Sequence, residues 1–429
     1  MQTILKTPRN GCAFQGALQT VQEIKNVIPI VHSTAGCAFQ NFLANSAAGF
    51  TTSFIPTEEI PGTDMQERHI IFGGASRLRE QIKNTLKVID GKLYVVLNSC
   101  PSAMVGDDVD AMVREVQEQG EKVVDGLQAG FHGDVHYGYQ QILTEIFQNL
   151  PKVENSGVQK EANLVNIFGI VPQKDLFFKG DLEEITRVLA SLGIKANIFF
   201  GKEDGSEELL NAKNASLNIV FSRWGNAPAE KLNALYNIPT LSFGSVPLGL
   251  EETAEFLKKV ADALSLDFSP AEKFLEEEAK RLDYYFSSLL EIFYQNHLAK
   301  TVDIVGDEAT VIKYANFLNT HFNVKIATAI ITDFFPSDDN PESAKAESLK
   351  NVAEKIFIAQ DATEIEKILR YTESNLILGS SLEESVAEKK GVPLLVVSYP
   401  AYHTVILNRT HAGITGALAV AEDFVATTL

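Results

Sequence analysis

Three cysteines are the residues of this sequence whose type and setting could carry chemistry. Cys12 lies in PRNGCAFQGA, Cys37 in HSTAGCAFQN and Cys100 in LNSCPSAMVGDD. Glycine precedes two of them and proline follows the third, so the sequence predicts each thiol on a turn or at a strand end, where a bulky group can approach the backbone. Thiolates in such positions favour the ligation of soft iron. The alternative is three buried free cysteines that act only as small apolar residues.

The number of thiols limits how iron would be held. Three cysteines supply one ligand too few for a [4Fe–4S] cluster that is bound by a single chain. The missing ligands would come from another residue type or from a second chain. The second option predicts an iron–sulfur cluster at a subunit interface.

Composition narrows the class of protein. The chain has 429 residues, of which 45% are hydrophobic and 22% charged, which is ordinary for a globular protein of two to three domains. Its formal charge of −19 argues against nucleic acid or an anionic membrane surface as the main partner. No apolar run is long enough to span a membrane, and the N-terminus lacks the apolar core of a signal peptide. With few cysteines and an odd number of them, the sequence predicts a cytoplasmic protein without a disulfide framework.

From about residue 160 onward, short apolar runs alternate with helical patterns. The runs predict strands and the amphipathic segments between them predict helices, which together indicate an α/β fold of parallel sheets with helices on both faces. Residues 271–298 predict one long amphipathic helix between two such units. The predicted strands are 163–171, 194–201, 217–222, 238–244, 302–307, 324–333, 355–360, 375–381 and 393–399.

The first 160 residues have a less regular pattern. Residues 91–100 predict a strand that ends at Cys100, where Pro101 prevents its continuation. Residues 106–120 predict a helix, and Asp107 and Asp108 are interpreted as its capping residues.

The cysteine motifs carry a resemblance to a known family. The pattern P-x-x-G-C-x-x-x-G-A, then I-V-H-S-x-x-G-C, then V-x-x-S-C-x-x-x-x-G-D-D resembles the nitrogenase component 1 superfamily. Residues 68–82 and 392–418 resemble further segments of that family. The resemblance implies three Rossmann-like, doubly wound parallel-sheet domains. These would be an N-terminal iron–sulfur cluster-binding domain at 1–160, a second domain with the long helix at 161–300, and a third at 301–429.

The resemblance also implies the ligands of a cluster. Cys12, Cys37 and Cys100 would bind a cluster that is shared with a homologous subunit. That cluster would be of the [8Fe–7S] P-cluster type, as in nitrogenases, or a [4Fe–4S] cubane, as in scaffold proteins and several relatives.

Four further residues would belong to the cofactor site. Gly11, Gly36 and Gly106 would allow close approach of the backbone and amide contacts to the sulfides. His32 matches a histidine of the family motif, where it would contribute to the site or, as the favoured interpretation, brace the turn as a satisfied loop histidine.

The sequence also bears on the subunit type and its partners. No cysteine follows Cys100, so the chain lacks the additional cysteine with which α-type subunits hold the active-site cofactor. The resemblance therefore implies a β-like subunit of a nitrogenase or nitrogenase-like oxidoreductase, in a heterodimer or heterotetramer with an α-like partner. The cluster would relay electrons to the partner's metal cofactor. The segment before Cys12 is shorter than the extension of molybdenum nitrogenase β subunits, which favours an alternative nitrogenase or a nitrogenase-like relative.

The source of electrons would be another protein. No G-x-x-x-x-G-K-S/T motif occurs, so ATP hydrolysis would belong to a [4Fe–4S] iron-protein reductase with its own P-loop. Two other functions remain open: a scaffold subunit for nitrogenase cofactor assembly, and a Rossmann-like small-molecule binding protein without a cluster.

Four further histidines are candidate ligands. His132 and His136 lie in FHGDVHYG, which predicts a loop rather than a helix and resembles the family's loop near the cluster. His403 and His411 lie in the C-terminal loop and are interpreted as surface or interface residues.

Overall fold

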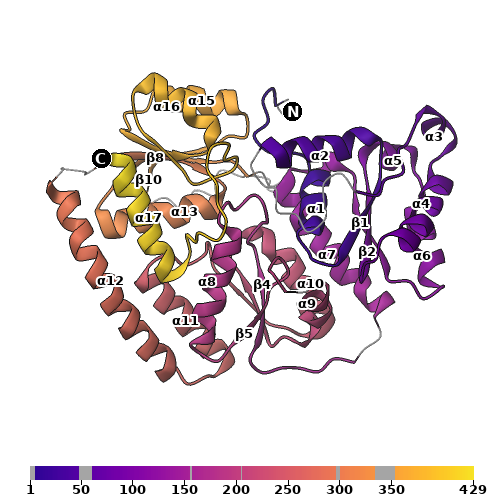
Figure 1. The fold of residues 1–429 in the computed structure, drawn as a ribbon, viewed down its shortest axis with the longest axis horizontal. Helices are drawn as coiled ribbons and strands as arrows, with labels where there is room; N and C mark the ends of the chain where they lie inside the picture. The colour runs from indigo at the N-terminus through magenta and orange to yellow at the C-terminus, as the bar shows by residue number, and fades with distance from the viewer. Residues whose placement is uncertain (1–4, 48–59, 155–156, 204, 296–299, 334–352) are drawn as a thin grey trace. The chain divides into compact units, whose positions relative to one another are not determined.

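The computed structural model describes residues 5–47, 60–154, 157–203, 205–295, 300–333 and 353–429. It has an α/β fold with three parallel sheets, which confirms the predicted fold class (Figure 1). The chain divides into two compact units. We call Asn10–Pro172 with Asn197–Thr240 the cysteine unit, and Met1–Arg9, Gln173–Ala196 and Leu241–Leu429 the C-terminal unit. The residue bounds of the three predicted domains stay a prediction.

The first sheet lies in the cysteine unit and has the strand order β1-β2-β3. Both pairings are parallel, and His32 at the end of β1 pairs with Asn98 at the end of β2. All residues of β1 and β2 are buried, because helices cover both faces of the sheet (Figure 1). The strands are β1 (Val27–His32), β2 (Leu93–Asn98) and β3 (Val123–Gln128), and the larger covering helices are α1 (Ala13–Gln22), α4 (Ala75–Val88), α6 (Val109–Gln117) and α7 (Val135–Val153).

A helix begins at the carboxyl end of each of these strands. These helices are α2 (Ala35–Ala47) after β1, α5 (Cys100–Val105) after β2 and the 3-10 helix η2 (Gly130–His132) after β3. Helix α3 (Glu67–Phe72) precedes α4. The first sheet therefore gathers the three helix starts at one edge, where parallel sheets usually place their functional residues.

Helices α1 and α7 approach each other very closely. A Cβ atom added to Gly16 would lie 2.0 Å from the carbonyl oxygen of Val135, and one added to Gly138 would lie 2.0 Å from that of Ala13. Each helix therefore needs a glycine where it meets the backbone of the other. This contact fixes the start of α1, and with it Cys12, against the start of α7.

The second sheet has the order β5-β4-β6-β7 and is joined by a chain of buried asparagines. Asn197 Nδ2 donates to Asn166 Oδ1 (2.8 Å), and Asn166 Nδ2 donates to Asn218 Oδ1 (2.9 Å). These bonds fix the register of three neighbouring strands, because a slip of one residue would move each amide to the other face. The strands are β4 (Leu164–Phe168), β5 (Lys195–Asn197), β6 (Leu217–Val220) and β7 (Thr240–Ser242), followed along the chain by α9 (Gly205–Asn211) after β5 and α10 (Asn226–Tyr236) after β6.

The third sheet lies in the C-terminal unit and has the order β10-β9-β8-β11-β12. Counted from its first strand this is 3-2-1-4-5, the order of a doubly wound Rossmann-like sheet. The strands are β8 (Thr301–Gly306), β9 (Lys325–Ile331), β10 (Ala353–Ile358), β11 (Leu376–Gly379) and β12 (Leu394–Val396). The helices of this unit are α8 (Phe178–Ala190), α11 (Leu250–Leu264), α12 (Ser269–Gln295), α13 (Glu308–Phe322), α15 (Ala362–Arg370), α16 (Glu384–Lys390) and α17 (Gly413–Thr428).

The long helix that the sequence predicts over 271–298 is α12, whose described part ends at Gln295. Within the described residues, no helix combines the length and apolar character that a membrane span requires.

Replacing Asn166 with leucine tests the asparagine chain. The change leaves the amides of Asn197 and Asn218 without their partner, and we expect the free energy of unfolding to fall by about 1–3 kcal/mol for each unsatisfied group. The measurement is denaturant unfolding followed by the fluorescence of Trp224, the only tryptophan, which is buried in the same unit. Asn233→Leu on the exposed side of α10 is the matched control. Equal unfolding midpoints for the two variants would contradict the stabilising role of the hydrogen-bonded asparagines.

Candidate metal centre

All three cysteines lie at helix starts in the cysteine unit. Cys12 is the N-cap residue of α1, Cys37 is the third residue of α2, and Cys100 is the first residue of α5. The expectation of a turn is therefore wrong for Cys37, which lies in the first turn of a helix. Cys100 lies two residues after the end of β2, close to the strand end where it was expected, and it also begins a helix. Pro101 is tolerated in the first turn of that helix, so it opens α5 instead of only ending β2.

Cys12 and Cys100 lie beside the same residue, Gly130. A Cβ atom added to Gly130 would lie 2.8 Å from Cys12 Sγ and 3.4 Å from Cys100 Sγ. The two sulfur atoms are thus separated by no more than the sum of these distances. Ala129, with a positive φ of 70°, donates its N–H to the carbonyl oxygen of Asn98 (3.0 Å) and so holds this turn against the end of β2.

The segment after η2 holds the start of α1 in place. The N–H of Ala13 donates to the carbonyl oxygen of Gly133 (2.8 Å), and Cys12 forms an isolated antiparallel bridge with Asp134. The Asp134 carboxylate caps α7 by accepting from the N–H groups of His136 and Tyr137. This segment belongs to FHGDVHYG and lies next to Cys12, and its proximity to a cluster stays a prediction.

The electrostatics of Cys12 favour a cationic neighbour. Partial loss of water around the sulfur raises the pKa of the Cys12 thiol, although the residue as a whole is exposed. The nearby Cys100 and Cys37 raise this pKa further. Hydrogen bonds from the N–H groups of Gln15 and Phe14 act in the opposite direction. Three thiolates that repel one another are stabilised together when they bind iron.

Two of the candidate donors are soft thiols that lie beside the same residue. Cys12 and Cys100 flank Gly130, and thiolates are the usual ligands of iron–sulfur clusters. In the part of the chain that the structure describes, no group of three or more His, Cys, Asp or Glu side chains is placed to hold one metal ion.

His32 is fully buried and both of its ring nitrogens have partners. Nδ1 lies 3.1 Å from Thr63 Oγ1, and Nε2 lies 3.0 Å from Asp107 Oδ2. Burial lowers the pKa of His32, opposed by the Asp107 carboxylate. Because a carboxylate only accepts, Nε2 carries a proton towards Asp107. Nδ1 contacts the Thr63 hydroxyl, which also donates to the carbonyl oxygen of Ser33 (3.2 Å). This geometry supports a bracing role for His32, and direct contact with a cofactor stays a prediction.

Asp107 has a role that the sequence interpretation did not assign to it. Asp108 caps α6 by accepting from the N–H of Ala111 (3.0 Å), as predicted. Asp107 is not a capping residue, because its carboxylate binds His32 and the N–H of Gly74 (2.7 Å) instead. One helix start needs one capping carboxylate, so the second acid in GDD was a signal that sequence reasoning could have used.

The three predicted glycines differ in what requires them. Gly106 ends α5 in the left-handed conformation, with φ of 80°. A Cβ atom on Gly11 would lie 1.9 Å from Gln15 Oε1, whereas one on Gly36 would meet only Thr34 Oγ1 at 3.9 Å. Contacts of these glycines to a cluster stay a prediction.

The four histidines fall into different environments. His136 lies in the first turn of α7, so the loop expectation is wrong for it, because Asp134 starts the helix. His132 is exposed in η2 and packs on Phe131. His403 is exposed, as expected.

His411 is buried, so the surface expectation is wrong for this residue. Its ring stacks on Phe177 at 3.5 Å, and Nδ1 lies 2.6 Å from Tyr314 Oη. Burial lowers its pKa to about 4.

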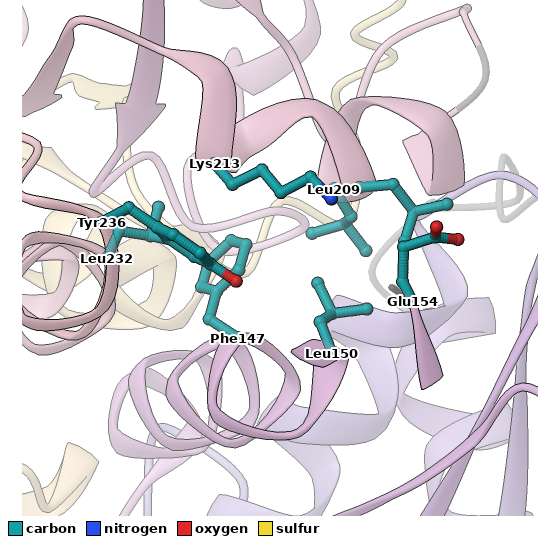
Figure 2. A pocket seen from close by; sticks show the side chains of 8 residues that line it. Phe147, Leu150, Glu154, Leu209, Lys213, Leu232 and Tyr236 are labelled. Atoms are coloured by element: carbon teal, nitrogen blue, oxygen red, sulfur yellow. The ribbon is translucent and has the colours of Figure 1, made fainter. Parts of the chain in front are cut away.

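A shallow pocket elsewhere in the cysteine unit offers no comparable chemistry (Figure 2). It lies between α7, α9 and α10, and apolar side chains make most of its wall. No cysteine lines it, and its charged lining residues, Glu154 and the buried Lys213, lie among leucine and aromatic side chains. The lining residues are Phe147, Leu150, Glu154, Leu209, Leu210, Lys213, Leu232 and Tyr236.

Comparison with known proteins decides the family. The family model for nitrogenase component 1 type oxidoreductases matches residues 12–429, beginning at the first cysteine. The chain belongs to this family. The sequence resemblance is thereby confirmed.

Relatives within the family have different roles. A nitrogenase molybdenum-iron protein beta chain of Methanococcus maripaludis is 24% identical, with 100% of this chain and 95% of the relative covered. The nitrogenase iron-molybdenum cofactor biosynthesis protein NifE of Clostridium pasteurianum is 23% identical, with 97% and 86% covered. The solved structure described as nitrogenase Cp1 at pH 6.5 matches with a TM-score of 0.81 at 17% identity, covering 100% of this chain and 94% of that chain. The last match confirms the fold.

A short bifunctional thiol reagent tests the convergence of the sulfurs. We expect it to link Cys12 to Cys100 in the metal-free chain, because both thiols border Gly130. Gly130→Ala places a methyl group in contact with both sulfurs, and the yield of the link falls several-fold. Peptide mass spectrometry identifies the linked pair.

Gly157→Ala is the control for this prediction, because a Cβ atom there would meet nothing. Failure of the unmodified chain to form the Cys12–Cys100 link would contradict the geometry of the site.

Proposed function

We propose that this chain is a β-like subunit of a nitrogenase-family oxidoreductase. It would hold an iron–sulfur cluster, of the [8Fe–7S] P-cluster type or a [4Fe–4S] cubane, at the interface with a homologous α-like subunit. A separate iron-protein reductase, which carries its own P-loop and [4Fe–4S] cluster, would supply the electrons. The complex would act in the cytoplasm.

The observation that carries this proposal is the set of partly exposed thiols at one edge of the first sheet. Cys12 is exposed, while Cys37 and Cys100 are half-buried. Thiols that are to be shared between two chains must remain open to the surface of each chain before assembly. A cluster enclosed by this chain alone would need further donors, which the described residues do not place around one ion.

The surroundings of the cysteines support a protein partner. Exposed apolar side chains lie on the helices that carry or adjoin the thiols, and their exposure to water is costly unless a partner covers them. We call them the apolar residues of the site: Phe39 on α2, Ile71 and Phe72 on α3, Met104 on α5 and Phe131 on η2, exposed by 60, 72, 85, 79 and 62%.

The residues of the site would have different roles. Cys12, Cys37 and Cys100 would bind iron as thiolates, and Gly130 leaves the room between two of them. His32 would hold the end of β1 in place behind the site. A bound iron–sulfur cluster supplies one-electron transfer at low potential.

A second candidate function is a scaffold subunit for cofactor assembly. The match to the biosynthesis protein NifE favours it, because its identity to this chain is almost the same as that of the beta chain. The three thiols would hold a cluster in either case. The type of cluster and turnover by the complex separate the two functions.

Anaerobic co-purification with native partners tests the proposal. We expect a brown complex that contains iron and a second, homologous chain. Electron paramagnetic resonance before and after reduction with dithionite distinguishes a P-cluster from a cubane. In the Cys37→Ala complex, iron content and pairing with the second chain fall together, because thiolates of both chains hold the cluster.

Two results would overturn the proposal. One is a colourless chain from cells in which a known iron–sulfur protein is fully loaded. The other is a Cys37→Ala complex with unchanged iron content, which would remove Cys37 from the ligands.

An apolar-to-acidic substitution tests the surface for the partner. Phe72→Asp puts a charge on an exposed position, so we expect the fold to persist and the yield of the two-chain complex to fall at least about tenfold, since burial of an unpaired charge is costly. Val88→Asp, at the C-terminal end of α4 and 81% exposed, is the matched control. Equal yields from both variants would contradict the assignment of this surface.

A further inference from the structure

The Asp107 carboxylate joins two parts of the cysteine unit. Its Oδ2 lies 3.0 Å from His32 Nε2, and its Oδ1 accepts from the N–H of Gly74 (2.7 Å). The side chains of His32 and Asp107 are 0% and 4% exposed. Each oxygen of this carboxylate therefore makes a different buried connection.

The first connection leads to the thiols. The carbonyl oxygen of His32 accepts from the N–H of Ser99 (3.1 Å) and from Ser102 Oγ (2.8 Å), which lie on either side of Cys100. His32 also ends β1, a few residues before Cys37. A displaced His32 would thus disturb the backbone that positions Cys37 and Cys100.

The second connection leads to the apolar residues of the site. Gly73 and Gly74 follow α3, whose last two residues are the exposed Ile71 and Phe72. Gly73 has a positive φ of 90°. A Cβ atom on Gly74 would lie 2.8 Å from Asp107 Oδ2 and 3.0 Å from His32 Cε1, so this turn packs directly on the pair.

We propose that Asp107 is a positioning residue that couples the end of α3, where the partner would dock, to the backbone that carries Cys37 and Cys100. Partner docking and cluster ligation then depend on one shared arrangement. The thiol of Cys12 is outside this coupling, because the contact between α1 and α7 positions it. The inference rests on the proposed function for the identity of the cluster and the partner, and the coupling itself is a property of the metal-free chain.

The hydrogen bond between His32 and Asp107 predicts which variants retain the coupling. Asp107→Ala removes both hydrogen bonds. Asp107→Asn keeps an oxygen for the Gly74 N–H, and its amide donates to His32 Nε2 once the ring carries its proton on Nδ1 and donates to Thr63 Oγ1. The asparagine variant is therefore the conservative replacement.

Hydrogen exchange and thiol labelling of the full-length, metal-free chain test the coupling. In Asp107→Ala we expect faster exchange in peptides that cover residues 67–78 and 98–106, and roughly tenfold faster labelling of Cys37 and Cys100, because local opening becomes easier. Labelling of Cys12 stays within about twofold of the unsubstituted chain. Asp107→Asn restores the exchange and labelling of the unsubstituted chain.

Asp108→Ala is the matched control, since it removes a neighbouring carboxylate that caps only α6. Faster labelling of all three cysteines in Asp107→Ala would indicate general unfolding and overturn the coupling, as would unchanged rates at Cys37 and Cys100. If exchange and labelling are unchanged in Asp107→Ala while Cys37→Ala loses iron, the coupling is wrong and the proposed function stands. If Asp107→Ala shows the expected exchange and labelling but the chain never binds iron, the coupling stands and the proposed function is wrong.

Discussion

Thiolates can share a cluster only where their sulfur atoms converge, and convergence in this chain depends on the close contact of α1 with α7. Gly16 and Gly138 permit that contact, since a side chain on either would overlap the opposing backbone. The contact places Cys12 beside the turn after β3, where Gly130 separates it from Cys100. Helix packing over some 120 residues of sequence thus determines the distance between two sulfur atoms.

The parallel sheet provides the second constraint. The carboxyl ends of β1 and β2 pair at His32 and Asn98, and the turn after β3 is held to Asn98 by Ala129. Three loops therefore meet at one edge of one sheet, which is where α/β proteins generally bind ligands. The site remains open to the surface there, which suits a cluster that two homologous chains complete together.

The sequence predicted the elements and the ligand candidates because both are local signals. Apolar runs mark buried strands, and glycine beside cysteine marks a site with little steric hindrance. The roles of Asp107 and Gly130 depend on partners that are distant in sequence, so spacing alone could not assign them. His411 shows the same limit. A polar residue in a loop is predicted to be exposed, and its burial depends on contacts with Phe177 and Tyr314, which are distant in sequence.

The most direct test of this account is a structure of the anaerobically purified complex with data recorded at the iron absorption edge. The account predicts iron density bonded to the sulfur atoms of Cys12, Cys37 and Cys100, with the remaining ligands supplied by a second, homologous chain. Iron bound elsewhere, with these three thiols free, would contradict it.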